Sequence, residues 1–325
     1  MKQIIFAIFI LLSKSLFAQK TFRVDNFSDK YYGKVFIADT KEVFSKGWVA
    51  VYEKGTNKEL IKVSSDEITY ELHNGKVLAN IKELPYGEQS QILYQDFNFD
   101  GVKDFAIMDG QNSCYHGPSF KVYLATGTKF KFSPDFTSLA QDYCGMFNID
   151  YKSKIISTMT KSGCCWHQFS EFKVKNNSPY PIKVVAEEMN LWGFIYDYDE
   201  DNLVNGKMVS SKYQKLDAGD LKDKIILSFE FEKKKRMYLI NSDSTLLYVF
   251  TDKNDKIELL YPEDFKYSKT ENTLSFKKYN TQFIIFDDKI VAKTPTKSME
   301  MKPVSKTKTG TLTRLDKLSL QNILY

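Results

Sequence analysis

One nine-residue segment carries oxygen-bearing side chains at the spacing that calcium-binding loops use. It reads Asp-Phe-Asn-Phe-Asp-Gly-Val-Lys-Asp and covers residues 96–104. Ca²⁺ takes about six to eight oxygen ligands at about 2.3–2.6 Å, and a curled loop can turn alternate side chains toward one point. The predicted ligands are the side chains of Asp96, Asn98, Asp100 and Asp104 and the backbone carbonyl of Val102. We therefore expect a calcium site here.

The remaining positions define the kind of loop. Gly101, at position 6, permits the sharp turn that such a loop needs. An EF-hand has a bidentate glutamate at position 12, where this chain has Ile107, so the segment is not an EF-hand. Three carboxylates this close repel one another unless a cation lies between them. The alternative interpretation is an acidic turn exposed to solvent.

A second acidic run covers residues 197–201 and has the same alternation of side chains. Asn202 stands where the glycine of a calcium loop should be. We therefore expect a solvated loop there, with a second metal site as the alternative.

The chain begins with the pattern of a secretory signal peptide. Lys2 precedes the apolar run 4–12, and Ala18 is a small residue suited to cleavage. We expect a cut after Ala18 and a mature protein that is periplasmic or secreted. The run is too short to cross about 30 Å of hydrocarbon, and Lys14 interrupts its extension. No transmembrane anchor is therefore expected after cleavage.

The cysteines are the next candidates for chemistry, and all lie within about fifty residues. They are Cys114, Cys144, Cys164 and Cys165. An even number in an exported protein indicates disulfides, and four cysteines allow three pairings. Because a bond between adjacent cysteines would strain the peptide, we favour Cys114 and Cys144 each bonding one of Cys164 and Cys165. The rival interpretation is a zinc site that includes His116 and His167, although the usual ligand spacing is missing.

The charge of the chain argues against nucleic-acid binding. The net charge of +5 falls to +3 without Lys2 and Lys14, because 44 basic and 41 acidic residues are left. Only three basic residues are arginines, and they are scattered along the chain. Nucleic-acid-binding proteins use arginine forks on bases and phosphates. We therefore expect no nucleic-acid partner.

Catalytic motifs are missing from the sequence. The chain has three histidines and lacks a G-x-S-x-G elbow, an H-E-x-x-H helix and a glycine-rich phosphate loop. A cysteine in a disulfide is not a nucleophile. We expect a protein that is not an enzyme. A carboxylate pair for glycoside hydrolysis is the alternative, because Asp and Glu occur throughout.

Short β segments must position these groups. Apolar runs rich in Val, Ile, Phe and Tyr recur about every ten residues, and no stretch of ten or more residues has a helical period. This pattern predicts an all-β fold, with an antiparallel β-sandwich or barrel over residues 19–185 that carries the calcium loop.

A second, smaller β domain follows. The less regular residues 186–222 are expected to form a linker or connecting loops, and β segments resume over 223–325. Within this domain the polar, Lys/Thr-rich residues 293–309 are expected to be mobile. Residues 312–325 are apolar enough to dock as a final strand.

Three segments together resemble a family of exported bacterial proteins. They are residues 96–104, residues 112–120 (Asn-Ser-Cys-Tyr-His-Gly-Pro-Ser-Phe) and residues 160–167 (Thr-Lys-Ser-Gly-Cys-Cys-Trp-His). The β-sandwich domain of that family carries an FG-GAP-like calcium loop and is similar to periplasmic inhibitors of invertebrate-type lysozymes. Some relatives are immunity proteins against cell-wall-cleaving effectors. The resemblance covers about residues 30–175.

The resemblance also implies a loop that binds a partner. Inhibitors of that group carry a Thr-Lys-Gly element and a Ser-Gly-x-x-Tyr loop that enters the lysozyme cleft. This chain has an inserted serine in the first element and tryptophan in place of tyrosine in the second. The candidate residues are Thr160, Lys161, Ser162, Gly163 and Trp166. The alternative interpretation is an ordinary β turn with Trp166 in the core.

Three hypotheses of function follow. The first is an exported calcium-binding protein that inhibits a lysozyme-like cell-wall hydrolase or acts as an immunity protein. The second is a structural or adhesive envelope protein without an enzyme target, in which calcium only stiffens the fold. The third is a hydrolase that uses surface carboxylates. The expected partner is thus a lysozyme-like hydrolase or another envelope protein.

Overall fold

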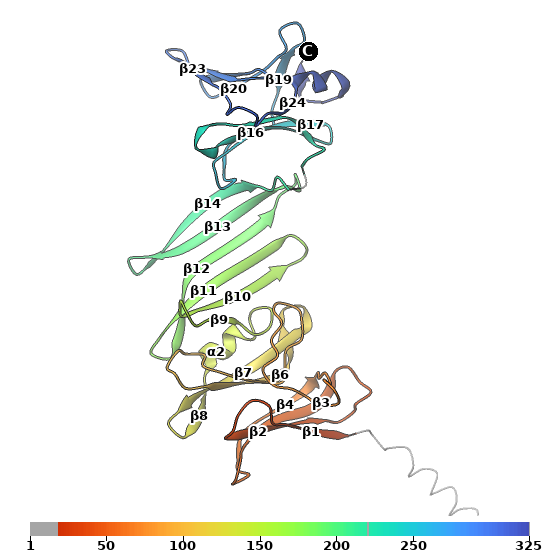
Figure 1. The fold of residues 1–325 in the computed structure, drawn as a ribbon, viewed down its shortest axis with the longest axis vertical. Helices are drawn as coiled ribbons and strands as arrows, with labels where there is room; N and C mark the ends of the chain where they lie inside the picture. The colour runs from red at the N-terminus through yellow and green to blue at the C-terminus, as the bar shows by residue number, and fades with distance from the viewer. Residues whose placement is uncertain (1–18, 220, 325) are drawn as a thin grey trace, which may run out of the picture. The chain divides into compact units, whose positions relative to one another are not determined.

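Strands dominate the chain, and the predicted all-β fold class is confirmed (Figure 1). The computed structural model describes residues 19–219 and 221–324. The predicted signal peptide, residues 1–18, lies outside them. None of the helices in the described part is long and apolar enough to cross a membrane.

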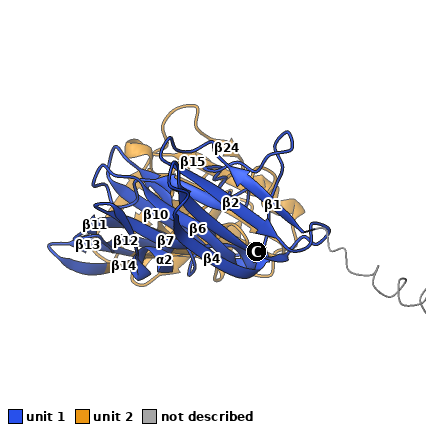
Figure 2. Ribbon diagram, turned by 90° about the horizontal axis from the view of Figure 1, so that it is seen from below, with its two compact units in different colours: residues 1–185, 201–209 blue, residues 186–200, 210–325 orange. Residues whose placement is uncertain are grey.

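Contacts divide the chain into two compact units, which Figure 2 colours separately. Unit 1 consists of Met1–Val185 and Asp201–Val209, and unit 2 consists of Ala186–Glu200 and Ser210–Tyr325. Each unit has its own buried core.

Two four-stranded antiparallel sheets build much of unit 1. The first has the order β1-β2-β3-β4, with β1 Lys20–Val24, β2 Tyr31–Ile37, β3 Ser45–Glu53 and β4 Glu59–Ile68. The second has the order β5-β6-β7-β8, with β5 Ile92–Gln95, β6 Asp104–Ser113, β7 Gly117–Thr126 and β8 Lys129–Phe132. A 3-10 helix, η1 (Cys114–His116), connects β6 to β7.

The core of unit 1 follows from the alternation of side chains along these strands. In β2, Val35 and Ile37 are fully buried while Lys34 and Phe36 are partly exposed, as expected for a sheet with one covered face. In β6, by contrast, Phe105, Ala106 and Ile107 are all fully buried. β6 is therefore a central strand that is covered on both faces.

One short helix, α2 (Pro134–Leu139), has no counterpart in the sequence prediction. The Ser133 hydroxyl caps it by accepting a hydrogen bond from the N–H of Phe136, and Pro134 occupies its first turn, which are typical helix-start features. Six residues are too few to show a helical period, which is why the periodicity of the sequence does not reveal this helix.

The next strands of unit 1 belong to an antiparallel sheet. They are β9 Asn148–Asp150, β10 Ile155–Ser162, β11 Trp166–Lys175 and β12 Ser178–Met189. β10 and β11 form a hairpin in which Ser162 lies opposite Trp166.

Residues 186–222 were expected to form a linker or connecting loops, but most of them lie in strands. This segment contains the end of β12 and two further strands, β13 Ile195–Val204 and β14 Lys207–Leu216. Their side chains are mostly exposed or half-exposed, so the apolar alternation that marks a strand is missing. Cross-strand pairs stabilise them instead: the rings of Tyr198 and Tyr213 stack at 5.1 Å, and Lys212 pairs with Asp199 at 2.8 Å.

Two sheets form most of unit 2. The first has the order β18-β17-β16-β15-β24, with β15 Ile225–Glu230, β16 Arg236–Ser242, β17 Thr245–Thr251, β18 Ile257–Tyr261 and β24 Thr309–Gly310. The second has the order β23-β22-β21-β20-β19-β25, with β19 Phe265–Ser268, β20 Thr273–Lys278, β21 Thr281–Ile285, β22 Ile290–Lys293, β23 Ser298–Met301 and β25 Ile323–Leu324. A 3-10 helix, η2 (Glu232–Lys234), joins β15 to β16.

The end of the chain also differs from expectation. The polar residues 293–309 contain β23, which pairs with β22. Residues 312–325 were expected to form one strand, but they begin with a 3-10 helix, η3 (Leu312–Lys317), whose Leu312 and Leu315 are fully buried. Only β25, which runs parallel to β19, fits the expected strand. The apolar residues of this segment thus dock through a helix as well as a strand.

Candidate functional site

The predicted calcium loop connects two paired strands. β5 ends at Gln95 and β6 begins at Asp104, and these residues are partners in the ladder. Residues 96–103 therefore leave the sheet and return at one point. Phe99 and Gly101 have φ angles of 64° and 90°, which turn the chain sharply and which glycine adopts at little cost. The predicted ligands are confined to one compact turn.

Side-chain oxygens of this turn accept hydrogen bonds from its own backbone N–H groups. Asp96 accepts hydrogen bonds from the N–H groups of Asp100 at 3.2 Å and Gly101 at 2.9 Å. Asp100 accepts from the N–H of Val102 at 2.8 Å and from the amide of Asn98 at 2.9 Å. Such bonds are typical of aspartate and asparagine in turns. The structure therefore places Asp96, Asn98 and Asp100 in one hydrogen-bonded turn.

Asp104 is the buried member of the set. Its side chain has no exposed surface, and its two oxygens accept hydrogen bonds at 2.8 Å from the N–H groups of Phe97 and Ala125. Burial raises the pKa of Asp104 to about 7, and the carboxylates of Asp100 and Asp96 add to the effect. The two N–H groups oppose this shift without cancelling it. A positive charge beside Asp104 would therefore favour its ionised form at neutral pH.

No side chain of residues 19–219 and 221–324 supplies that charge through an ion pair. None of the ion pairs within those residues includes the carboxylate of Asp96, Asp100 or Asp104. Lys103, in the loop itself, lies over the ring of Tyr94 with its Nζ 5.4 Å from the centroid. The donor set, oxygens only and uncompensated in charge, fits a hard cation such as Ca²⁺.

The carboxylates of the loop are not drawn tightly together. Within residues 19–219 and 221–324, one set of three His, Cys, Asp or Glu side chains has all its ligand atoms within 4.8 Å of one another, and it is Glu71, His73 and Glu88. Oxygens on opposite sides of a Ca²⁺ ion lie about 5 Å apart. Calcium binding would therefore pull the loop carboxylates inward.

The second acidic run is not a loop, contrary to expectation. It lies in β13, where Asp197 accepts from the side-chain amide of Gln214 at 2.7 Å and Glu200 from the hydroxyl of Tyr213 at 2.7 Å. Both partners are in β14. These acidic groups serve cross-strand pairing.

The disulfide pairing also differs from the one that the sequence favours. All four cysteines are in disulfides, but the bonds join Cys114 to Cys144 and Cys164 to Cys165. The Cα atoms of Cys114 and Cys144 lie 4.7 Å apart, within the range for a bond. Cys164 and Cys165 are neighbours in the sequence and lie in the turn between Ser162 and Trp166. No free thiol is present among the described cysteines, so the rival zinc site with His116 and His167 has no thiolate ligands.

The candidate partner-binding residues lie at the tip of the β10–β11 hairpin. Thr160, Lys161 and Ser162 end β10, and Trp166 begins β11. Gly163, with a φ of 64°, opens the turn. Trp166 is partly exposed and is not a member of the buried core. The segment is thus a β turn that keeps its aromatic ring at the surface.

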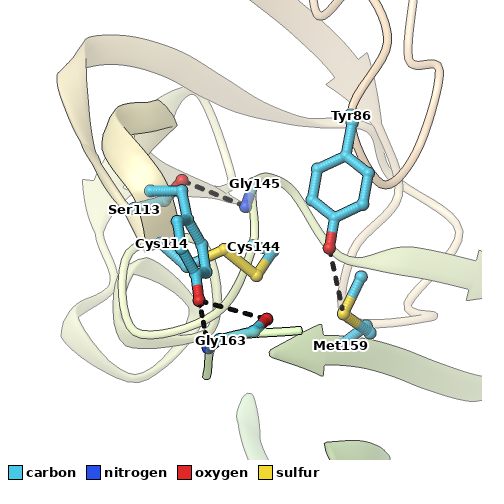
Figure 3. The surroundings of a disulfide bond; sticks show 8 residues. Tyr86, Ser113, Cys114, Cys144, Gly145, Met159 and Gly163 are labelled. Atoms are coloured by element: carbon cyan, nitrogen blue, oxygen red, sulfur yellow. Dashed lines mark hydrogen bonds between the residues drawn. A yellow bond between two sulfur atoms is a disulfide. The ribbon is translucent and has the colours of Figure 1, made fainter. Parts of the chain in front are cut away.

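Lys161 lies between two exposed tyrosine rings. Its Nζ is 4.5 Å from the centroid of Tyr86 and 4.8 Å from that of Tyr115, distances at which an ammonium group and a ring attract. The Tyr115 hydroxyl accepts a hydrogen bond from the N–H of Gly163 at 2.5 Å. The Tyr86 hydroxyl contacts the sulfur of Met159 at 3.9 Å (Figure 3). The rings are 58% and 60% exposed. We call Tyr86, Tyr115 and Lys161 the tyrosine–lysine surface.

Sequence reasoning missed both tyrosines. Tyr115 lies in η1, beside Cys114, and its bond to Gly163 joins η1 to the hairpin tip. The nearby Cys144 donates its N–H to the carbonyl of Met159 at 2.8 Å. Because Cys114 precedes Tyr115 and is bonded to Cys144, the cysteine next to Tyr115 in the sequence was the one sign that this tyrosine lies near the hairpin. Tyr86 carries no comparable signal in the sequence.

Comparisons with known proteins add little. No family model matches this chain, and no curated protein matches it significantly. A Xanthomonas type IV secretion system related protein is similar over 61% of this chain and 95% of its own, with 19% identity and a TM-score of 0.45. Prolyl oligopeptidase B from Galerina marginata is similar over 89% of this chain and 42% of its own, with 7% identity and a TM-score of 0.24. Likenesses this weak carry no argument about activity.

Proposed function

We propose that this chain is an exported calcium-binding protein that binds a lysozyme-like cell-wall hydrolase through the tyrosine–lysine surface and so inhibits it. The observation that carries the proposal is the position of Lys161, held between two exposed rings beside a disulfide-bonded turn. Exposed aromatic groups and well-placed charges are typical of the residues that dominate binding energy.

The chemistry of such a target complements this surface. Glycoside hydrolases cleave sugars between two carboxyl groups, which an ammonium group can pair with. Because the rings of Tyr86 and Tyr115 already restrict Lys161, little side-chain freedom is lost when it enters a cleft. A cavity of about 380 Å³, lined by Met159, Phe169 and others, lies beside the hairpin and offers apolar area next to the charge.

Export and calcium complete the proposal. Four bonded cysteines are typical of an oxidising compartment outside the cytoplasm, as is the predicted signal peptide. Calcium would offset most of the negative charge of the loop formed by Asp96, Asn98, Asp100 and Asp104 and stabilise the turn that joins β5 to β6. Its role is therefore structural.

The test is hydrolysis of peptidoglycan by chicken-, invertebrate- and phage-type lysozymes with and without the purified protein. We expect inhibition of at least one class, and Lys161→Ala should weaken it at least tenfold, or about 1.4 kcal/mol. Lys62→Ala is the matched control, because Lys62 also lies over a ring, that of Trp48, at 4.5 Å. No inhibition of any class, or equal effects of the two variants, would contradict the proposal. Binding to glycans without inhibition would favour the adhesive alternative.

A further inference from the structure

Glu71, His73 and Glu88 bring three metal-binding groups to one point, apart from the calcium loop. Their ligand atoms all lie within 4.8 Å of one another. The Nε2 atom of His73 is 2.9 Å from both carboxylate oxygens of Glu88. In a tetrahedral zinc site with bonds of about 2.0 Å, neighbouring ligand atoms lie about 3.3 Å apart. The His73 and Glu88 atoms are therefore close to the spacing that a zinc ion requires, and the Glu71 carboxylate lies within 4.8 Å of both.

The backbone holds these groups in place on two turns. His73 and Lys76 exchange two backbone hydrogen bonds of 2.8 and 3.1 Å around Asn74 and Gly75, which both have positive φ. Glu88 closes the second turn, since its carbonyl accepts a hydrogen bond from the N–H of Glu83 at 2.8 Å. Ligands on fixed turns lose little freedom when a metal binds.

The site opens onto a cavity. Glu71 and Glu88 both line a cavity of about 750 Å³, together with Tyr86 and Gln89. Gln89 is only 4% exposed, and its side-chain Nε2 has no hydrogen-bond partner. Three protein ligands leave one coordination position of a tetrahedral zinc ion free. The cavity provides room for a water molecule or a small anion at that position.

The ligand types select the metal. Calcium and magnesium prefer oxygen alone, whereas imidazole favours zinc, copper, nickel or iron. A set of one imidazole and two carboxylates without thiolates is therefore suited to Zn²⁺ and is different in kind from the oxygen-only calcium loop.

We propose that Glu71, His73 and Glu88 form a zinc site with three protein ligands and a fourth position that faces the cavity. It does not depend on the calcium loop or on the partner surface.

The test is calorimetric titration of untagged, chelator-treated protein with ZnCl₂ under non-reducing conditions, so that neither a histidine tag nor a free thiol binds the metal. We expect one Zn²⁺ per chain with a micromolar or lower Kd, and a tetrahedral visible spectrum when Co²⁺ replaces it. His73→Ala and Glu88→Gln should each weaken binding at least tenfold. Glu71→Gln, which alters an exposed side chain, should also weaken binding and keeps the test open if either of the other variants fails to fold.

Two control variants show whether zinc binds at this cluster and nowhere else. His116→Ala removes a histidine that pairs with one carboxylate only, that of Glu67 at 3.3 Å, and should leave zinc affinity unchanged. Asp66→Ala removes an exposed aspartate paired with Lys46 and should also leave zinc affinity unchanged. Absence of zinc binding to folded protein, or unchanged affinity in the His73, Glu88 and Glu71 variants, would overturn the proposal.

Discussion

At the scale of single residues, Asp104 is a buried carboxyl group whose raised pKa makes it sensitive to a nearby cation. Its carboxyl group is fully buried at the start of β6, accepts two backbone hydrogen bonds and still has a pKa raised to about 7, mainly by burial. A cation beside it would stabilise the ionised form and lower that pKa. In the proposed calcium site, Asp104 would therefore make calcium binding depend on pH.

Without calcium, stability should fall as the pH rises. The folded-state pKa of Asp104, about 7, lies above its usual value of 3.8, so the folded protein holds this proton more tightly than the unfolded chain. The resulting stabilisation is fully present below about pH 4 and is lost as the pH rises to about 7. Urea unfolding in chelator across this range measures it, and Asp104→Asn should flatten the dependence. A profile that is the same in the variant would contradict the assignment.

With calcium, the same proton should be released. At pH 6, Ca²⁺ must displace it from Asp104, so the calorimetric binding enthalpy should vary with the ionisation enthalpy of the buffer. At pH 8.5 that variation should vanish. Equal proton release at both pH values would show that another group is involved.

Site residues were predictable where their partners are close in sequence and not where the fold brings distant segments together. The calcium-loop residues are close in sequence, and the structure places Asp96, Asn98 and Asp100 in one turn. Tyr86, His73 and Glu88 escaped prediction because their partners come from segments that only the fold brings together.

At the scale of elements, the two disulfides lie where η1 meets the β10–β11 hairpin, and they close loops of very different length. The Cys114–Cys144 bond closes a loop of 30 residues, whereas the Cys164–Cys165 bond joins neighbouring residues. The two bonds therefore have different consequences for stability, because the entropy removed from the unfolded chain grows with the length of the loop.

We expect the double variant Cys114→Ser/Cys144→Ser to lose about 3–4 kcal/mol of unfolding free energy. The variant Cys164→Ser/Cys165→Ser should lose far less and should instead impair partner binding. Denaturant unfolding of both variants, with peptide mapping of the disulfides, checks this. A larger loss in the second variant, or a mapped bond between Cys114 and Cys164 or Cys165, would contradict the pairing.

Strands were predictable where at least one face is buried and not where both faces are exposed to solvent. β2 and β6 contain the apolar residues that a core requires, and such apolar runs are the basis on which the sequence predicts an all-β fold. β13 and β14 are built from charged and polar residues whose cross-strand partners stabilise them, so their composition resembled that of a linker. The cysteine pairing could not be derived because it depends on which turns meet.

At the scale of the whole molecule, the two units have separate hydrophobic cores, so we expect them to unfold in separate steps. The buried residues of unit 1 form one cluster, and those of unit 2 form others. Chains with more than one core commonly unfold in more than one step. The predicted calcium loop lies entirely in unit 1.

Differential scanning calorimetry should therefore resolve two transitions. Chelator should lower the transition of unit 1 and leave the other within about one degree, because a ligand stabilises only the structure it binds. Asp100→Ala identifies the transition of unit 1 by lowering it in calcium. Equal shifts of both transitions would show that the units unfold together.

Calcium binding by residues 96–104 is the central claim, and direct titration tests it. Chelator-treated protein should release or absorb heat on addition of Ca²⁺ and saturate at one ion per chain, and Asp100→Ala should abolish the signal. Asp66→Ala, which removes an exposed aspartate paired with Lys46, should bind as the parent protein does. A flat titration of the parent protein, or undiminished binding by Asp100→Ala, would contradict the account.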